Sequence, residues 1–245
     1  MTFAFGKVDC VPGLRSDRFL LACILGLAAL ARVAALVVWH TELQRDPDAY
    51  LDVANHIVTG DGFTKGETGQ PTAARPPLYP MLLAIIVRFG GGPLSIGVLQ
   101  LILGVATVWL TYRLGRRLGT SRVGLVAAGI VAVDPLLVKY TSAVMTETLF
   151  VFLTAGLLLS MAAYAETPTD RRRHALAGVI FGLAALCRPT MWAFGVLWLV
   201  VELLQMAFSA ERRQRCHLQR LPWVGLLTAG VVISPWVIRN VVVFG

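Results

Sequence analysis

Residues 19–39 read FLLACILGLAALARVAALVVW, an apolar run of about 21 residues that only Arg32 interrupts. A helix needs roughly 20 mainly apolar residues to cross a bilayer. The alternative is a signal peptide cleaved near Ala29-Leu30-Ala31, but the apolar part of such a peptide spans only about 7–15 residues. We therefore interpret the run as an uncleaved membrane anchor helix.

The rest of the chain has the same character, because 56% of its 245 residues are hydrophobic and only 15% are charged. Soluble domains contain about 25% charged residues. Six further runs are candidate membrane spans: 94–112, 123–138, 147–164, 175–187, 191–208 and 223–238. The run 78–89 is shorter and suits an interfacial helix better than a span. We predict an all-α integral membrane protein with about seven transmembrane helices, forming one polytopic domain over residues 1–245.

The net charge of +8 is distributed unevenly along this arrangement. Segments 1–18, 113–122, 166–174 and 209–221 hold fourteen of the 22 lysines and arginines. Because positive residues favour the cytoplasmic side, we predict a cytoplasmic N-terminal tail (1–18) and an extracytoplasmic loop (40–92). The excess charge is thus an orientation signal, and we expect no nucleic acid partner. The four cysteines and four histidines have no spacing typical of a disulfide, zinc or other metal site.

The loop 40–92 is long and rich in acidic residues, and long ordered loops are usually functional. Its acidic residues are Glu42, Asp46, Asp48, Asp52, Asp61 and Glu67. Apolar residues recur at helical spacing over 48–59, which predicts an amphipathic helix on the membrane surface. Asp46-Pro47 suits an N-cap with proline at N1, and Asp48 suits the first turn. Both acids therefore have a structural as well as a functional interpretation.

Other polar residues lie at the same predicted membrane face. Arg75 is in the loop, Glu147 opens one span, and Lys139, Arg188 and Arg239 lie at the ends of three others. Each of these, like Asp134, could alone be an interface residue, and we treat Arg32 and Glu202 as structural. Together they would suit a lipid-phosphate substrate, because arginine grips phosphate oxygens and a carboxylate can take a proton from an acceptor hydroxyl.

Four motifs connect these residues. They are Asp46-Pro-Asp-Ala-Tyr50 followed by Gly60-Asp-Gly-Phe63, Arg75-Pro-Pro-Leu-Tyr79-Pro80, Thr146-Glu-Thr-Leu-Phe150, and Ser234-Pro-Trp-Val-Ile-Arg239-Asn240. In their order and spacing the chain resembles the GT-C superfamily of membrane glycosyltransferases that use polyprenyl-phosphate sugars. The resemblance is greatest to the aminoarabinose transferase and protein O-mannosyltransferase branch.

This resemblance implies an inverting sugar transfer at the outer face of a bacterial-type plasma membrane. It implies that an aspartate is the base, with Asp46 and Asp48 both open, and that Glu147 is the second acidic residue. It also implies that Arg75 binds the donor phosphate. To the phosphate-binding residues we add Lys139, Arg188 and Arg239, and we place Tyr50 and Tyr79 in the substrate loop. No cofactor is certain; Mg²⁺ or Mn²⁺ on Asp46 and Glu147 stays open. The expected partners are the lipid bilayer, the lipid-linked sugar, and a glycan, lipid or protein acceptor.

Relatives in this superfamily continue with further spans, so we expect the chain to be an amino-terminal module that lacks their carboxy-terminal part. Two other functions stay open. The chain could be an inactive or partner fragment of such an enzyme, or a small transporter or flippase-type protein. Transporters usually show related repeats and polar breaks at the midplane. Here the charged groups gather at one face instead, which favours the transferase.

Overall fold

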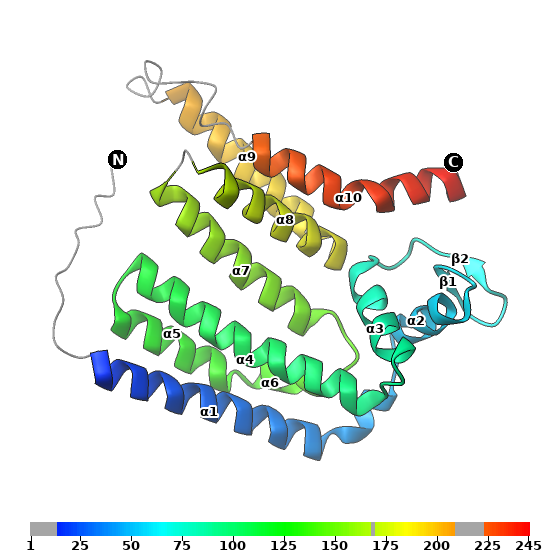
Figure 1. Ribbon diagram of the computed structural model, residues 1–245, viewed down its shortest axis with the longest axis horizontal. Helices are drawn as coiled ribbons and strands as arrows, with labels where there is room; N and C mark the ends of the chain where they lie inside the picture. Colours follow the sequence, from blue (N-terminus) through cyan, green and yellow to red (C-terminus); the bar gives the residue numbers. More distant parts are fainter. Residues whose placement is uncertain (1–13, 168–169, 209–222) are drawn as a thin grey trace.

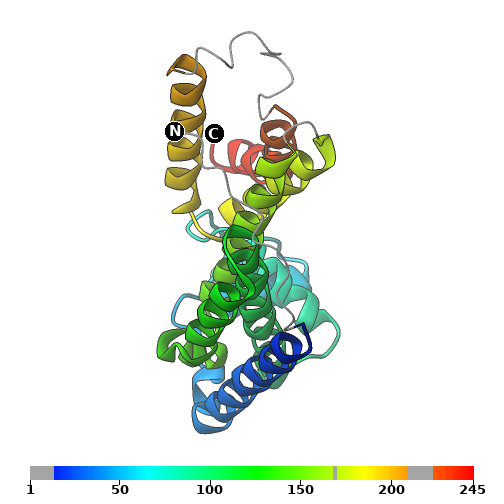
Figure 2. The same cartoon turned by 90° about the vertical axis from the view of Figure 1, so that its left-hand side faces the viewer.

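The computed structural model describes residues 14–167, 170–208 and 223–245. Its long helices run in alternating directions along the chain (Figure 1). They are α1 (Leu14–Val38), α4 (Pro93–Leu118), α5 (Ser121–Val133), α7 (Glu147–Glu166), α8 (Arg171–Cys187), α9 (Met191–Phe208) and α10 (Trp223–Phe244). In Figures 1 and 2, α1 lies at one side of the bundle and α9 and α10 lie at the other. Between them α4 packs on α1, α5 and α7, and α8 joins α7 to α10.

Each predicted span overlaps one of these helices, which confirms an all-α membrane protein, but among the described residues fewer of them than the predicted seven are long and apolar enough to cross a membrane. In the described part of the chain, four helices are long and apolar enough to cross a membrane: Ser16–Val38, Pro93–Leu118, Glu147–Glu166 and Trp223–Phe244. A bent pair of helices formed by α5 and its continuation would make a fifth span. Helix α8 has 17 residues and begins with three arginines, and the apolar part of α9, Met191–Val201, is shorter still.

The span predicted over 123–138 is interrupted, and this corrects the sequence interpretation. Helix α5 ends at Val133, and α6 (Pro135–Lys139) with η2 (Tyr140–Ser142) continues at an angle of 51°. Pro135 cannot donate a backbone hydrogen bond, so a new helix starts there. Asp134 is its N-cap, because its Oδ1 accepts hydrogen bonds from the backbone N–H groups of Leu136 (3.0 Å) and Leu137 (2.9 Å).

The loop after α1 folds into a small structured region at one end of the bundle (Figure 1). It contains η1 (His40–Gln44), α2 (Tyr50–Thr59), strands β1 (Thr64–Lys65) and β2 (Gln70–Pro71) in an antiparallel pair, and α3 (Leu78–Arg88). Both predicted surface helices are therefore present. However, α2 begins at Tyr50 rather than at residue 48, because Ala49 adopts a left-handed conformation (φ 59°). Pro47 is consequently not its first residue.

Arg32, which we treated as structural, is buried inside the helix bundle. Its side chain is 1% exposed between α1, α4 and α5. The guanidinium donates to the carbonyls of Ala28 (3.1 Å) and Ala132 (3.2 Å). Gly104 of α4 makes room for it, since a Cβ there would overlap the Arg32 side chain. Arg32 thus ties three helices together next to the bend at Asp134. The side chain of Glu202 lies outside the described part.

The turns from α4 to α5 and from α7 to α8 lie at the end opposite α2, α3 and the strands (Figure 1). The described residues of three arginine-rich segments lie at this end, namely 14–18, 113–122 and those of 166–174. The fourth segment, 209–221, lies outside the described residues. Charge therefore separates along the bundle as predicted, with arginines at one end and the acidic loop at the other.

Candidate functional site

Asp46 is held rigidly at the beginning of α2. Its Oδ1 accepts a hydrogen bond from the backbone N–H of Tyr50 (2.8 Å), and its Oδ2 accepts one from that of Asp52 (2.9 Å). These are N–H groups of the first helical turn, which lack partners inside a helix. The predicted N-cap position is wrong, because Ala49 is the residue that precedes α2; Asp46 binds these N–H groups from four residues before the helix. Each oxygen keeps a second lone pair for another partner.

Asp48 forms an ion pair with Arg75, which arrives from the segment after β2. The Nη2 of Arg75 lies 2.7 Å from Asp48 Oδ1, and its Nε donates to the Asp48 carbonyl (3.1 Å). The same guanidinium lies 5.4 Å from the centre of the Tyr50 ring, within range of a cation–π contact. The loop acid and the predicted phosphate-binding arginine therefore meet directly.

Tyr50 and Tyr79 form the buried floor of this region. Their rings meet edge to face at 5.3 Å, and both side chains are at most 5% exposed. Burial raises the pKa of Tyr50 and that of Tyr79, so both hydroxyls stay protonated at neutral pH. Burial is the main cause of the raised pKa of Tyr79, and negative charge on neighbouring groups, among them Cys187, Asp46 and Glu147, adds to it.

Glu147 begins α7 and pairs with Arg188 at the end of α8. Arg188 Nη1 lies 2.9 Å from Glu147 Oε1, and the Glu147 side chain is only 16% exposed. Its Oε2 is buried and has no hydrogen-bond partner in the structure. Arg188 also lies 5.7 Å from the centre of the Phe150 ring. A buried carboxylate oxygen without a partner is costly and is found mainly at functional sites.

The structure brings most of the predicted site residues together, but not all. Seven of them form one cluster, which we call the acidic site. Its members are Asp46, Asp48, Tyr50, Arg75, Tyr79, Glu147 and Arg188. Lys139 lies at the exposed end of α6, and no ion pair to it is found among the described residues. Arg239 contacts the segment 63–72 rather than the acidic site.

Gln100 is a site residue that the sequence interpretation missed. It is 1% exposed on α4, and its Nε2 donates to the carbonyl of Ala143 and lies 3.5 Å from the hydroxyl of Tyr79. Gln100 thus ties the floor of the acidic site to the segment that leads into Glu147. A glutamine inside an apolar span was the available signal, because such residues are rare in membranes and usually bridge helices.

Few side chains in the acidic site could act as ligands for a metal ion. No group of three His, Cys, Asp or Glu side chains within the described ranges is close enough to hold an ion. Of the predicted ligands, Asp46 accepts two backbone hydrogen bonds, and Glu147 offers its Oε2. Mg²⁺ can bind through one or two carboxylates when a substrate phosphate supplies further oxygens.

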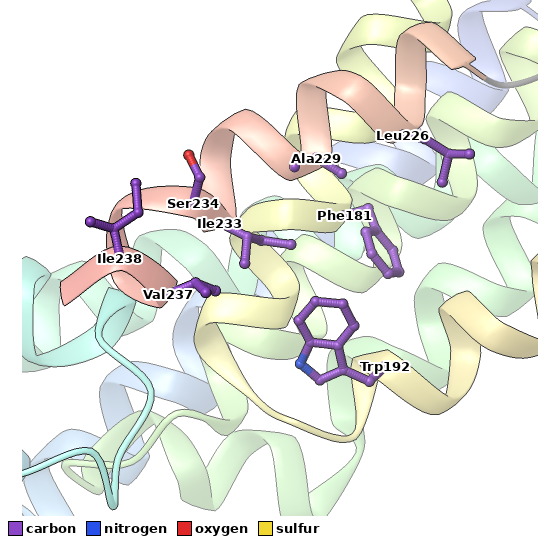
Figure 3. A pocket seen from close by; sticks show the side chains of 9 residues that line it. Phe181, Trp192, Leu226, Ala229, Ile233, Ser234, Val237 and Ile238 are labelled. Carbon is purple, nitrogen blue, oxygen red and sulfur yellow. The ribbon is translucent and has the colours of Figure 1, made fainter. Parts of the chain in front are cut away.

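An apolar pocket of about 380 Å³ lies between α8, α9 and α10 (Figure 3). Phe181 of α8 and Trp192 of α9 face Ile233 and Val237 of α10 across it. Trp192 is four residues after Arg188, across the turn that joins α8 to α9, so the pocket and Arg188 are close along the chain. Its lining suits a hydrocarbon chain rather than a polar ligand.

The chain matches a known protein family over about two thirds of its length. A family model described as dolichyl-phosphate-mannose-protein mannosyltransferase matches residues 74–238. The matched region begins just before Arg75, contains Glu147 and Arg188, and ends just before Arg239. No curated protein matches the chain. Because the match covers more than half of the chain, the protein belongs to this family of membrane glycosyltransferases.

Proposed function

We propose that this family member transfers a sugar from a polyprenyl-phosphate donor to an acceptor at the extracytoplasmic face of the membrane. The observation that carries the proposal is the acidic site, where the ion pairs Asp48–Arg75 and Glu147–Arg188 lie around the buried Tyr50 and Tyr79. The arginine-rich turns at the opposite end support this orientation under the positive-inside rule.

Asp46 is the base in this proposal. Asp48 is engaged by Arg75, so it could take a proton only by weakening that ion pair. Asp46 accepts only backbone hydrogen bonds, which fix its position and leave lone pairs free. It takes the proton of the acceptor hydroxyl while the acceptor oxygen bonds to the anomeric carbon. The bond from that carbon to the phosphate oxygen breaks, and the lipid phosphate leaves with the electron pair. A single displacement of this kind inverts the anomeric configuration.

Arg75 and Arg188 stabilise the departing phosphate. Each guanidinium has five N–H donors, and the ion pairs with Asp48 and Glu147 use only some of them. The remaining donors can bind phosphate oxygens, on which negative charge grows as the sugar leaves. Asp48 and Glu147 then hold the two arginines in place, and Glu147 Oε2 can accept a hydrogen bond from the acceptor.

The pocket between α8, α9 and α10 supports a lipid-linked donor. It is apolar, and its Trp192 follows Arg188 across the turn between α8 and α9, so a hydrocarbon chain could lie in it while its phosphate reaches the arginine. If a divalent ion takes part, Glu147 Oε2 and Asp46 would hold it and it would add positive charge at the phosphate. We propose that the two arginines are sufficient for this task.

The experiment is a transfer assay with the purified protein in lipid, using polyprenyl-phosphate mannose as the donor probe. Asp46→Asn should lower the transfer rate at least 100-fold, because general-base catalysis contributes about 10²–10⁴-fold. The matched control is Glu42→Gln, since Glu42 pairs only with the exposed Arg45 on the surface and should leave the rate unchanged. Full activity of Asp46→Asn would show that Asp46 is not the base.

A further inference from the structure

Arg239 of α10 closes the base of the β1–β2 hairpin. Its Nη2 donates to the carbonyl of Phe63 (2.9 Å), and its Nη1 donates to that of Thr72 (2.8 Å) and to Oδ1 of Asn240 (2.9 Å). Phe63 and Thr72 are themselves joined, because the Thr72 N–H donates to the Phe63 carbonyl (3.2 Å). The guanidinium of Arg239 therefore binds the residue just before β1 and the residue just after β2.

The Arg239 side chain also lies in an aromatic cage. Its Cζ is 5.5 Å from the ring centre of Phe63, 5.1 Å from that of Trp236 and 5.3 Å from that of Phe244. The Phe63 and Trp236 rings meet edge to face at 4.7 Å. Phe63 comes from the loop and the other two rings come from α10, so the cage joins the two elements around the positive charge.

The hairpin depends on such contacts for its order. Each of its strands has two residues, and an isolated two-stranded hairpin is at best marginally stable. On its other side the hairpin is held by α2, because the Gly66 N–H donates to Asp52 Oδ2 (2.9 Å). The hairpin is thus fastened between α2 and α10, and Arg239 donates two hydrogen bonds to it from the α10 side.

The chain leaving the hairpin leads directly to the acidic site. Thr72 is three residues before Arg75, and its Oγ1 accepts a hydrogen bond from the Ala74 N–H (3.2 Å). Pro76 and Pro77 follow Arg75 and restrict the backbone there. A shift of Thr72 would therefore move the backbone of Arg75, whose guanidinium lies 2.7 Å from Asp48.

We propose that Arg239 is a positioning residue that clamps the hairpin to α10 and thereby sets the place of Arg75 opposite Asp48. This assigns Arg239 a role different from donor-phosphate binding, since its Nη groups are occupied by carbonyl and amide oxygens. The link to sugar transfer rests on the proposed function; the clamp itself does not.

The clamp is tested by labelling a cysteine at Thr64, which is 6% exposed in the hairpin. Thr64→Cys is combined with Arg239→Gln, Arg239→Lys or the control Arg45→Gln, a surface arginine in the same loop. The labelling rate with a membrane-impermeant maleimide is measured in proteoliposomes, and the rate of the parent with its native cysteines is subtracted. We expect labelling about 10-fold faster with Arg239→Gln, an intermediate rate with Arg239→Lys and no change with Arg45→Gln. Unchanged labelling with Arg239→Gln overturns the clamp.

The link to Arg75 is tested by transfer rates of Arg239→Gln, Arg75→Gln and the double variant. Misplacement of a binding group by about 1 Å can lower a rate about 100-fold. Because Arg239 acts through Arg75, the double variant should be no slower than Arg75→Gln alone. Losses that multiply would overturn the positioning role. If the parent shows no transfer, the proposed function fails, whereas the labelling result still decides the clamp.

Discussion

Replacing Gly178 with alanine would place a methyl group at the closest approach of α8 and α10. A Cβ on Gly178 would lie 2.7 Å from the carbonyl carbon of Gly225 and would also overlap the Gly225 carbonyl oxygen and Thr228 Oγ1. The obstacle is mainly backbone, so side-chain rotation cannot relieve it and the helices must separate. Thr228 Oγ1 lies 3.2 Å from the carbonyl of Ala175 across this interface and shares its one proton with the Val224 carbonyl (2.9 Å) of its own helix; separation would remove the contact with Ala175.

The expected net effect is destabilisation by about 1–2 kcal/mol. Alanine gains about 1 kcal/mol over glycine within a helix, whereas overpacking costs about 1–3 kcal/mol. The lost interhelical hydrogen bond adds about 0.6 kcal/mol to the cost. Gly129→Ala in α5 is the matched control, because its Cβ would meet nothing within 4 Å and only the helix gain remains.

The assay is reversible unfolding of both variants in mixed micelles titrated with SDS, followed by circular dichroism. Gly178→Ala should unfold at lower SDS than the parent, and Gly129→Ala at equal or higher SDS. Because α8 carries Arg188 and α10 carries Arg239, Gly178→Ala should also speed the labelling of a cysteine at position 64. A Gly178→Ala protein as stable as Gly129→Ala would refute the close packing of α8 on α10.

Other predictions concern single charges. Arg188→Gln leaves the Glu147 carboxylate without its partner and should destabilise the protein by about 1–3 kcal/mol, and adding Glu147→Gln should restore stability in the same unfolding assay. Gly104→Ala should cost about 1–3 kcal/mol alone but less in combination with Arg32→Ala, which empties the space that the new methyl group needs. Transfer should persist in EDTA, because the arginines carry the charge stabilisation; loss of transfer that Mg²⁺ restores would contradict this. A cysteine at the exposed Gln70 should react with an impermeant maleimide in intact cells, and protection there would reverse the orientation.

The sequence predicted the helices well where length and apolar composition decide the structure. The run 19–39 corresponds to α1, and the short runs in the acidic loop correspond to α2 and α3. The break at Asp134-Pro135 was not predicted, because the apolar run continues across it. Its cause is local, since proline starts a new helix that Asp134 caps.

The pairing of the site residues depends on tertiary structure. The motifs identified Asp48, Arg75 and Glu147 as candidates, and its place at the end of a span identified Arg188. Only the packing of α2, α3, α7 and α8 shows which acid meets which arginine. Arg239 shows the opposite case. Its place at the end of a span indicated a phosphate ligand, yet its contacts are the carbonyls of a hairpin 167 and 176 positions earlier in the chain.

The central claim is a single displacement at the acidic site, and the anomeric configuration of the product tests it most directly. The purified protein is given polyprenyl-phosphate mannose and an acceptor, and the new glycosidic bond is examined by NMR. The account predicts a product of inverted configuration, with one lipid phosphate released for each bond formed, and almost no product with Asp46→Asn. Retention of configuration, or release of lipid phosphate without a new glycosidic bond, would contradict the account.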